Sequence, residues 1–172
     1  MQSQSERTKN LVLIALLSAM ALAVQWMESL LPTMFPGIPV RIGFSNIFVL
    51  FAFLAGKRRE AVFIVLLRTC VFCLISGNVS GALYSLAGGL LSYGGMYAVY
   101  PLYQKEKISE MGLSMTGSFL FQTGQMLVGL FVVGKAMLYY FSLMGLLSLP
   151  AGIVTGLLAK LLYRRLEKRI PI

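Results

Sequence analysis

The chain has 172 residues, of which 58% are hydrophobic, and it carries a formal net charge of +9. A typical soluble domain is only about 45–50% apolar, so this composition excludes an ordinary soluble fold and predicts an integral membrane protein. The sequence contains no Asp and no His. This excludes aspartate-rich metal–diphosphate motifs, histidine metal sites and most histidine-based acid–base catalysis. We therefore expect no enzymatic activity, no cofactor and no bound metal.

Six apolar segments follow one another along the chain, and most reach the roughly 17–25 residues that a membrane-spanning helix needs. They predict an all-α membrane protein with six transmembrane helices in an S-component-like bundle, a single integral membrane domain over residues 1–172. The second segment is short, so its helix is either incomplete or extended by residues of the preceding loop. The segments comprise residues 11–31, 43–56, 60–76, 80–103, 113–134 and 136–163.

The basic residues predict the orientation of these helices. With the N-terminus inside, Arg41 and Lys135 fall on the outer side and Arg68 within the membrane, while all other Lys and Arg residues are cytoplasmic. Cytoplasmic loops carry an excess of Lys and Arg, so both termini are predicted to be cytoplasmic in a multi-pass protein of the cell membrane. Topology thus accounts for the net charge, and we expect no nucleic-acid partner. The cytoplasmic set comprises Arg7, Lys9, Lys57, Arg58, Arg59, Lys105, Lys107, Lys160, Arg164, Arg165, Lys168 and Arg169.

The first helix carries Ala15, Ala19 and Ala23 at a spacing of four residues, and Glu28 lies near its outer end. Small residues at this spacing let another helix approach closely, which is one way in which helices associate in lipid. Two readings stay open: the stripe packs inside this chain, or it docks a partner helix. The loop that follows, LPTMFPGIPVR, is rich in Pro and Gly, which predicts an irregular and fairly rigid connection on the outer side.

Arg68 lies in the middle of an apolar stretch from Ala61 to Ile75. A charge near the bilayer centre costs at least roughly 2.5–3.5 kcal/mol, and such a residue usually faces a partner, a cavity or a substrate. Cys70 and Cys73 follow in the same stretch. Because no further thiol or His accompanies them, we interpret them as two buried, small apolar side chains rather than a metal or redox pair.

Further polar residues are expected at the depth of Arg68, and Gln122 and Gln125 share a face of the fifth helix because they are three residues apart. The functional reading is a polar pocket in which two guanidinium groups bind an anionic small-molecule substrate. The alternative is an internal ion pair between Arg68 and Glu28, with the amide side chains bonding across helices. One carboxylate cannot neutralise both arginines, which favours the pocket. The candidate residues are Glu28, Arg41, Asn46, Arg68, Asn78, Gln122 and Gln125.

Glycines are also spaced for close helix contact at Gly77-x-x-x-Gly81 and Gly152-x-x-x-Gly156, and the fourth helix contains Gly88, Gly89, Gly94 and Gly95. Without a Cβ atom, glycine allows two helix backbones to approach. We interpret these glycines mainly as sites of packing within the chain.

Three stretches occur in order between residues 36 and 92: PGIPVRIGFSNIFVLFAFLAG, KRREAVFIVLLR and SGNVSGALYSLAGGLLS. They resemble the Gx transporter family, which is labelled heptaprenyl diphosphate synthase component I and is similar to the S-components of energy-coupling factor (ECF) transporters. Asn46 and Arg68 match the family's pattern. Arg41 stands where the family usually has Lys, and Phe121-Gln122 stands where it has His-Asn.

The resemblance implies a six-helix S-component fold with an outward-facing binding pocket. It also implies that Ala15, Ala19 and Ala23 match the Ala-x-x-x-Ala motif that contacts the transmembrane coupling protein, which works with two ABC ATPases. We therefore expect a substrate-binding S-component of an ECF importer, which captures an anionic amphipathic vitamin, isoprenoid precursor or quinone precursor. The alternative is a noncatalytic membrane subunit associated with prenyl diphosphate synthesis.

Overall fold

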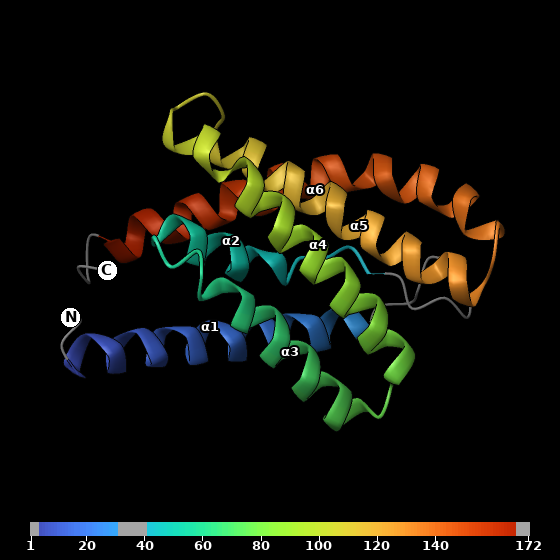
Figure 1. Ribbon diagram of the computed structural model, residues 1–172, viewed down its shortest axis with the longest axis horizontal. Coiled ribbons are helices and arrows are strands. Elements are labelled where there is room, and N and C mark those ends of the chain that lie inside the picture. Colours follow the sequence, from blue (N-terminus) through green and yellow to red (C-terminus); the bar gives the residue numbers. More distant parts are fainter. Residues whose placement is uncertain (1–3, 31–40, 168–172) are drawn as a thin grey trace.

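The computed structural model describes residues 4–30 and 41–167, which form six α-helices and no strand (Figure 1). Each predicted apolar segment coincides with one helix, so the all-α fold is confirmed. The predicted irregular connection after the first helix falls mostly on residues 31–40, outside the described residues. The helices are α1 (Gln4–Leu30), α2 (Asn46–Leu54), α3 (Ala61–Ser76), α4 (Val79–Gln104), α5 (Glu110–Val132) and α6 (Ala136–Glu167).

Three stretches are long and apolar enough to cross a membrane: Arg7–Leu30, Glu110–Val132 and Ala136–Leu166. They indicate a membrane protein. Helix α3 is apolar but has 16 residues, which is about 24 Å of helix against a hydrocarbon core of about 30 Å. Helix α4 is longer, at 26 residues, but it contains many Gly, Ser and Tyr residues and is not one of the three sufficiently apolar stretches.

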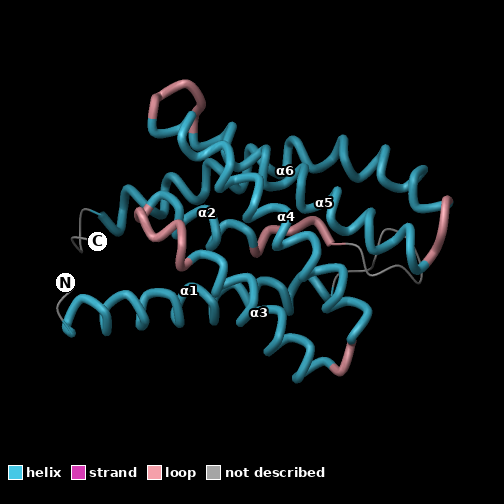
Figure 2. The backbone as a smooth tube through the Cα atoms, in the orientation of Figure 1, coloured by secondary structure: helices cyan, strands magenta, loops and turns pink. Residues whose placement is uncertain are grey.

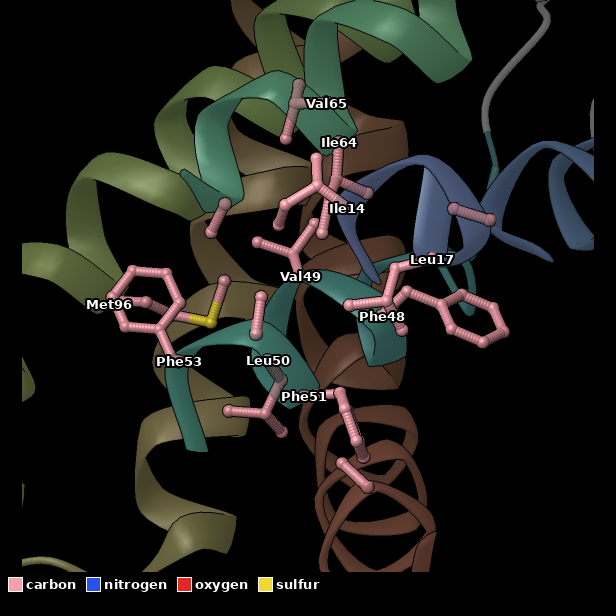
Figure 3. Close-up of a cluster of buried hydrophobic side chains, with 14 of the residues drawn as sticks. Ile14, Leu17, Phe48, Val49, Leu50, Phe51, Phe53, Ile64, Val65 and Met96 are labelled. Atoms are coloured by element: carbon pink, nitrogen blue, oxygen red, sulfur yellow. The ribbon is translucent and has the colours of Figure 1, made fainter. Parts of the chain in front are cut away.

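Helix α2 lies at the centre of the bundle because it is apolar on every side. Its nine residues include a continuous buried run from Phe48 to Phe53, and a helix that is hydrophobic all round has to be covered on all faces. It contacts each of the other five helices. Figure 3 shows Leu17 of α1, Ile64 of α3 and Met96 of α4 packed around it. The short second segment is therefore an internal helix.

The helices alternate in direction along the chain, so the connections gather at two ends of the bundle (Figures 1 and 2). The start of α1 and the end of α6 lie at the same end as the connections 55–60 and 105–109; we call this the terminal end. The opposite end holds the connections 77–78 and 133–135. Glycines in left-handed conformations make both of these turns, with φ of 63° at Gly77 and 82° at Gly134, a region that other residues rarely adopt.

Glycines in α5 and α6 allow close packing within the chain. A Cβ atom on Gly152 would lie 2.8 Å from Cα of Met115, and one on Gly156 would lie 3.0 Å from Cα of Met111. These contacts confirm the prediction of internal packing at Gly152 and Gly156. The prediction was wrong for Gly77, which ends α3 instead of packing against a neighbouring helix.

Candidate functional site

The chain enters α2 through a non-helical stretch, Arg41–Ser45, which is buried except at Ile42 and Phe44 and which we call the entry segment (Figure 2). Backbone groups buried away from water need hydrogen-bond partners, and a non-helical stretch has to find them elsewhere in the protein. Gly43 is required here because its φ is +90° and a Cβ atom would lie 2.7 Å from the ring of Phe121. The polar side chains predicted as a site gather around this segment.

Gln122 and Gln125 of α5 hold the backbone of Arg41. The Arg41 N–H donates to Oε1 of Gln125 at 2.9 Å. The Arg41 carbonyl accepts from Nε2 of Gln122 and Nε2 of Gln125, both at 2.9 Å. Both glutamines are buried, so their shared helix face serves the entry segment, and Gln125 satisfies both backbone groups of Arg41.

Glu28 of α1 holds the next part of the entry segment. Its Oε1 accepts from the backbone N–H of Gly43 at 3.0 Å and of Phe44 at 2.6 Å. Its Oε2 is buried and has no hydrogen-bond partner among the described residues. Glu28 and Arg68 form no ion pair within the described ranges, so the ion pair of the alternative interpretation is absent. The amides of Gln122 and Gln125, however, do bond within the protein, as that interpretation predicted. An ion pair does join Lys160 and Glu110 at 3.1 Å, near the terminal end.

Arg68 of α3 is fully buried, with an exposed fraction of 0%. Its Nη1 donates to Oγ of Ser45, and its Nη2 donates to Oδ1 of Asn46 at 2.8 Å. Nδ2 of Asn46 donates in turn to Oγ of Ser92 on α4 at 3.2 Å. These four residues, the Arg68 network, join α3, the start of α2 and α4. Gly89 leaves room for them, since a Cβ atom there would lie 3.1 Å from Nη2 of Arg68.

The Arg41 guanidinium has different surroundings. It lies over the ring of Phe72 at 4.3 Å from the centroid, a cation–π contact. Only 8% of the residue is exposed, yet Nη1 is buried with no hydrogen-bond partner in the described part of the chain. Gly81 accommodates it, because a Cβ atom there would lie 3.1 Å from Nη2. Glycines of α4 therefore accommodate both guanidinium groups.

Sequence reasoning missed Gln25, one turn before Glu28 on α1. It is fully buried, its Oε1 accepts from Oγ of Ser85 at 3.3 Å, and its Nε2 has no partner within the described residues. An amide in an otherwise apolar helix was a signal that could have found it. We call Gln25, Glu28, Arg41 and Phe72 the Arg41 group. Ser45 and Ser92 were not predicted either, because serine is common in membrane helices and the sequence carried no signal for these two.

The cluster holds more positive than negative charge. Glu28 acts electrostatically on both arginines, and Arg41 and Arg68 also repel each other. Among these three groups there are two guanidiniums for one carboxylate. A single anion bound here would balance the charge, and charge-assisted hydrogen bonds to guanidinium are among the strongest that proteins form.

Three other residues from the sequence analysis are exposed or only partly buried: Asn78, Cys70 and Cys73. Asn78 caps α4, with its Oδ1 accepting the Gly81 N–H at 2.8 Å, and it borders the Arg41 group because Gly81 lies beside both side chains. Cys70 is exposed and Cys73 is partly buried, and both are free thiols. The prediction of burial was wrong for Cys70, because this position faces away from the other helices.

Ala15, Ala19 and Ala23 all lie on an exposed face of α1. The opposite face of the helix is buried through residues such as Leu17 and Ala21, where α1 packs against α2 and α3. The reading that the alanine stripe packs inside this chain is therefore wrong. The stripe is available to another helix.

Together these features define an all-helical membrane protein whose interior holds a polar cluster with excess positive charge. The described ranges contain no group of three or more His, Cys, Asp or Glu residues that could hold a metal ion. The chain belongs to the family described as heptaprenyl diphosphate synthase component I, whose model matches residues 17–162. This name points to a membrane component linked to heptaprenyl diphosphate synthesis and to a further synthase component. No curated protein and no solved structure gives a significant match.

Proposed function

We propose that this protein is the substrate-binding S-component of an ECF-type importer and that it captures a small organic anion. The Arg41 guanidinium carries the proposal: it is almost completely buried, and Nη1 has no hydrogen-bond partner among the described residues. A buried charged group with an unsatisfied hydrogen-bond donor is costly. An anion that bonds to Arg41 supplies that partner, and Arg68 adds a second positive charge nearby.

In the orientation that we propose, all six helices belong to one membrane-embedded unit with cytoplasmic termini. Lys57, Arg58, Arg59, Lys105 and Lys107 lie in the two connections at the terminal end, as the positive-inside rule favours for a cytoplasmic side. The Arg41 group borders Gly81 and Asn78, at the start of α4 and at the opposite end of the bundle. A ligand would thus enter from outside the cell.

The exposed alanine stripe supports the assembly. Ala15, Ala19 and Ala23 present a face of α1 that nothing in the described chain covers, and a face of small residues suits close approach of a second helix. We propose that this face docks on the transmembrane coupling protein, which brings two ABC ATPases to the complex. ATP hydrolysis by those partners would then drive release of the ligand inside the cell.

A second function is supported by the family's description. A component of a synthase could be a noncatalytic membrane subunit that holds a soluble prenyl diphosphate synthase. The chain has no Asp, so the aspartate-rich magnesium–diphosphate motifs would have to come from that partner.

Co-purification from native membranes in mild detergent, followed by mass spectrometry, separates the two functions. The importer predicts a coupling protein and two ATPases in the complex, whereas recovery of an Asp-rich soluble synthase without ATPases would reject it in favour of the alternative. Ala19→Leu should reduce recovery of the coupling protein at least about tenfold, because a bulky side chain blocks close helix contact. Ala98→Leu is the matched control, since Ala98 is an exposed alanine on α4.

A further inference from the structure

The unpaired atoms of the Arg41 group define a chemical class of ligand. We infer that the ligand is a monoanion that also carries an N–H or O–H donor, such as a hydroxy acid, and not a diphosphate ester. This inference rests on the proposed function of the same cluster and narrows it.

The hydrogen-bonding capacity of the cluster is mixed. Nη1 of Arg41 and Nε2 of Gln25 are buried donors without partners in the described chain. Oε2 of Glu28 is a buried acceptor without a partner, because the two backbone N–H bonds both go to Oε1. An ionised carboxylate can only accept hydrogen bonds. A ligand that satisfies this set therefore needs acceptor atoms for the two donors and a donor for Glu28.

The charge count leads to the same class. Two guanidiniums and one carboxylate leave an excess of one positive charge, which a monoanion neutralises. A diphosphate ester carries several negative charges and would place some of them near Glu28. Like charges in a poorly solvated site repel strongly, so Glu28 selects against such ligands while it binds the donor group of a hydroxy acid.

Walls for the ligand's apolar part are available beside the charges. Trp26 follows Gln25 directly on α1, and its ring meets Phe72 edge to face at a centroid distance of 6.0 Å. The Arg41 guanidinium covers one face of Phe72. Polar recognition and an aromatic surface are thus adjacent, as in most small-molecule sites.

Three small anions test the inference without knowledge of the natural ligand: glycolate, which has a carboxylate and a hydroxyl donor; acetate, which lacks the donor; and phosphate at a pH where it is mainly dianionic. Each is titrated into the purified full-length protein in detergent while the midpoint of thermal unfolding is recorded. We expect half-maximal stabilisation at about tenfold lower concentration for glycolate than for acetate, since a hydrogen bond to a charged group is worth about that factor. Phosphate should be the weakest of the three.

Glu28→Gln sharpens the test, because its amide oxygen can still accept the N–H groups of Gly43 and Phe44 while Oε2 becomes a donor nitrogen. The variant should lose the preference for glycolate and should bind phosphate better than acetate. Glu110→Gln is the control and should keep the wild-type order, since Glu110 pairs with Lys160 away from the cluster. If Glu28→Gln does not fold, the order in which the three anions stabilise the wild-type protein decides whether the inference holds.

The outcomes separate this inference from the proposed function. If none of the anions stabilises the wild-type protein more than Arg41→Met, the proposed anion site itself is wrong. If Arg41→Met removes the stabilisation by anions, but phosphate stabilises the wild type as well as glycolate or better, the anion site stands. The inferred ligand class, a monoanion with a hydrogen-bond donor, is then wrong. The inference is supported if glycolate stabilises the wild type at lower concentration than acetate and phosphate do, and if Glu28→Gln loses this preference and binds phosphate better than acetate.

Discussion

The two buried arginines lie in one cluster but have different surroundings. In the Arg68 network, Nη1 and Nη2 both bond to side chains at the start of α2. In the Arg41 group, the guanidinium lies on an aromatic ring and its Nη1 is unpaired within the described residues. We propose from this comparison that Arg68 holds the fold whereas Arg41 offers a binding site, and that their hydrogen-bond partners distinguish the two roles. We therefore expect replacement of Arg68 to lower mainly the stability, and replacement of Arg41 to lower mainly the binding of anions.

Arg68→Met should have the largest effect on stability. It removes both donors to Ser45 and Asn46 and leaves buried oxygens unpaired, which costs about 3 kcal/mol in total when each unsatisfied group costs roughly 1–3 kcal/mol. Chemical unfolding in detergent measures the loss. A change below about 0.5 kcal/mol would show that these bonds do not hold the entry to α2.

Gln125→Leu should come next. It leaves the Arg41 N–H without its partner, at a cost of about 2 kcal/mol for a buried unpaired donor. Gln122→Leu is the matched variant: the Arg41 carbonyl keeps its bond from Gln125, so the loss should stay below about 1 kcal/mol. Equal losses in the two variants would contradict the assigned hydrogen bonds.

Asn78→Ala should have a smaller effect, because it removes the cap at the N-terminus of α4 and such caps are worth about 1 kcal/mol. Asn78→Asp keeps an acceptor and should retain most of the stability. The titration of acetate, measured on both variants, tells capping from ligand binding: a loss of anion affinity with unchanged stability would place Asn78 in the binding site.

Arg41→Met should change stability least, by less than about 1 kcal/mol, because the lost cation–π contact is offset by removal of a buried charge. It should nevertheless abolish stabilisation by small anions. Arg58→Met is the matched control, since Arg58 lies over the rings of Tyr97 and Tyr100 near the terminal end. If Arg41→Met unfolds the protein while Arg68→Met leaves it stable, the roles assigned to the two arginines are reversed.

Helix boundaries show where sequence reasoning reaches and where it stops. The apolar segment 80–103 agrees with α4 within one residue at each end, because hydropathy changes sharply there. The segment 43–56 overestimates α2, which begins only at Asn46. The left-handed backbone of Gly43 and the turn that follows it delay the start of the helix, and an apolar pattern does not report such conformations.

The candidate site was found only as a set of residue types. Asn46, Arg68, Gln122 and Gln125 could be named because polar groups in apolar helices are costly and therefore purposeful. Their partners could not be named: the Arg41 backbone and Gln125 are 84 residues apart in the chain. Whether an amide bonds to a ligand or to a distant backbone group depends on which helix faces meet.

The sequence by itself determined the all-helical class, the order of the six helices and the polar residues inside them, because hydropathy and charge are local properties of the chain. The tertiary structure alone decided that α2 is an internal helix and that the alanine stripe faces outward. It also decided that both Nη atoms of Arg68 bond within the protein, while Nη1 of Arg41 has no hydrogen-bond partner among the described residues. Each of these outcomes depends on contacts between residues distant in sequence, and packing in three dimensions sets those contacts.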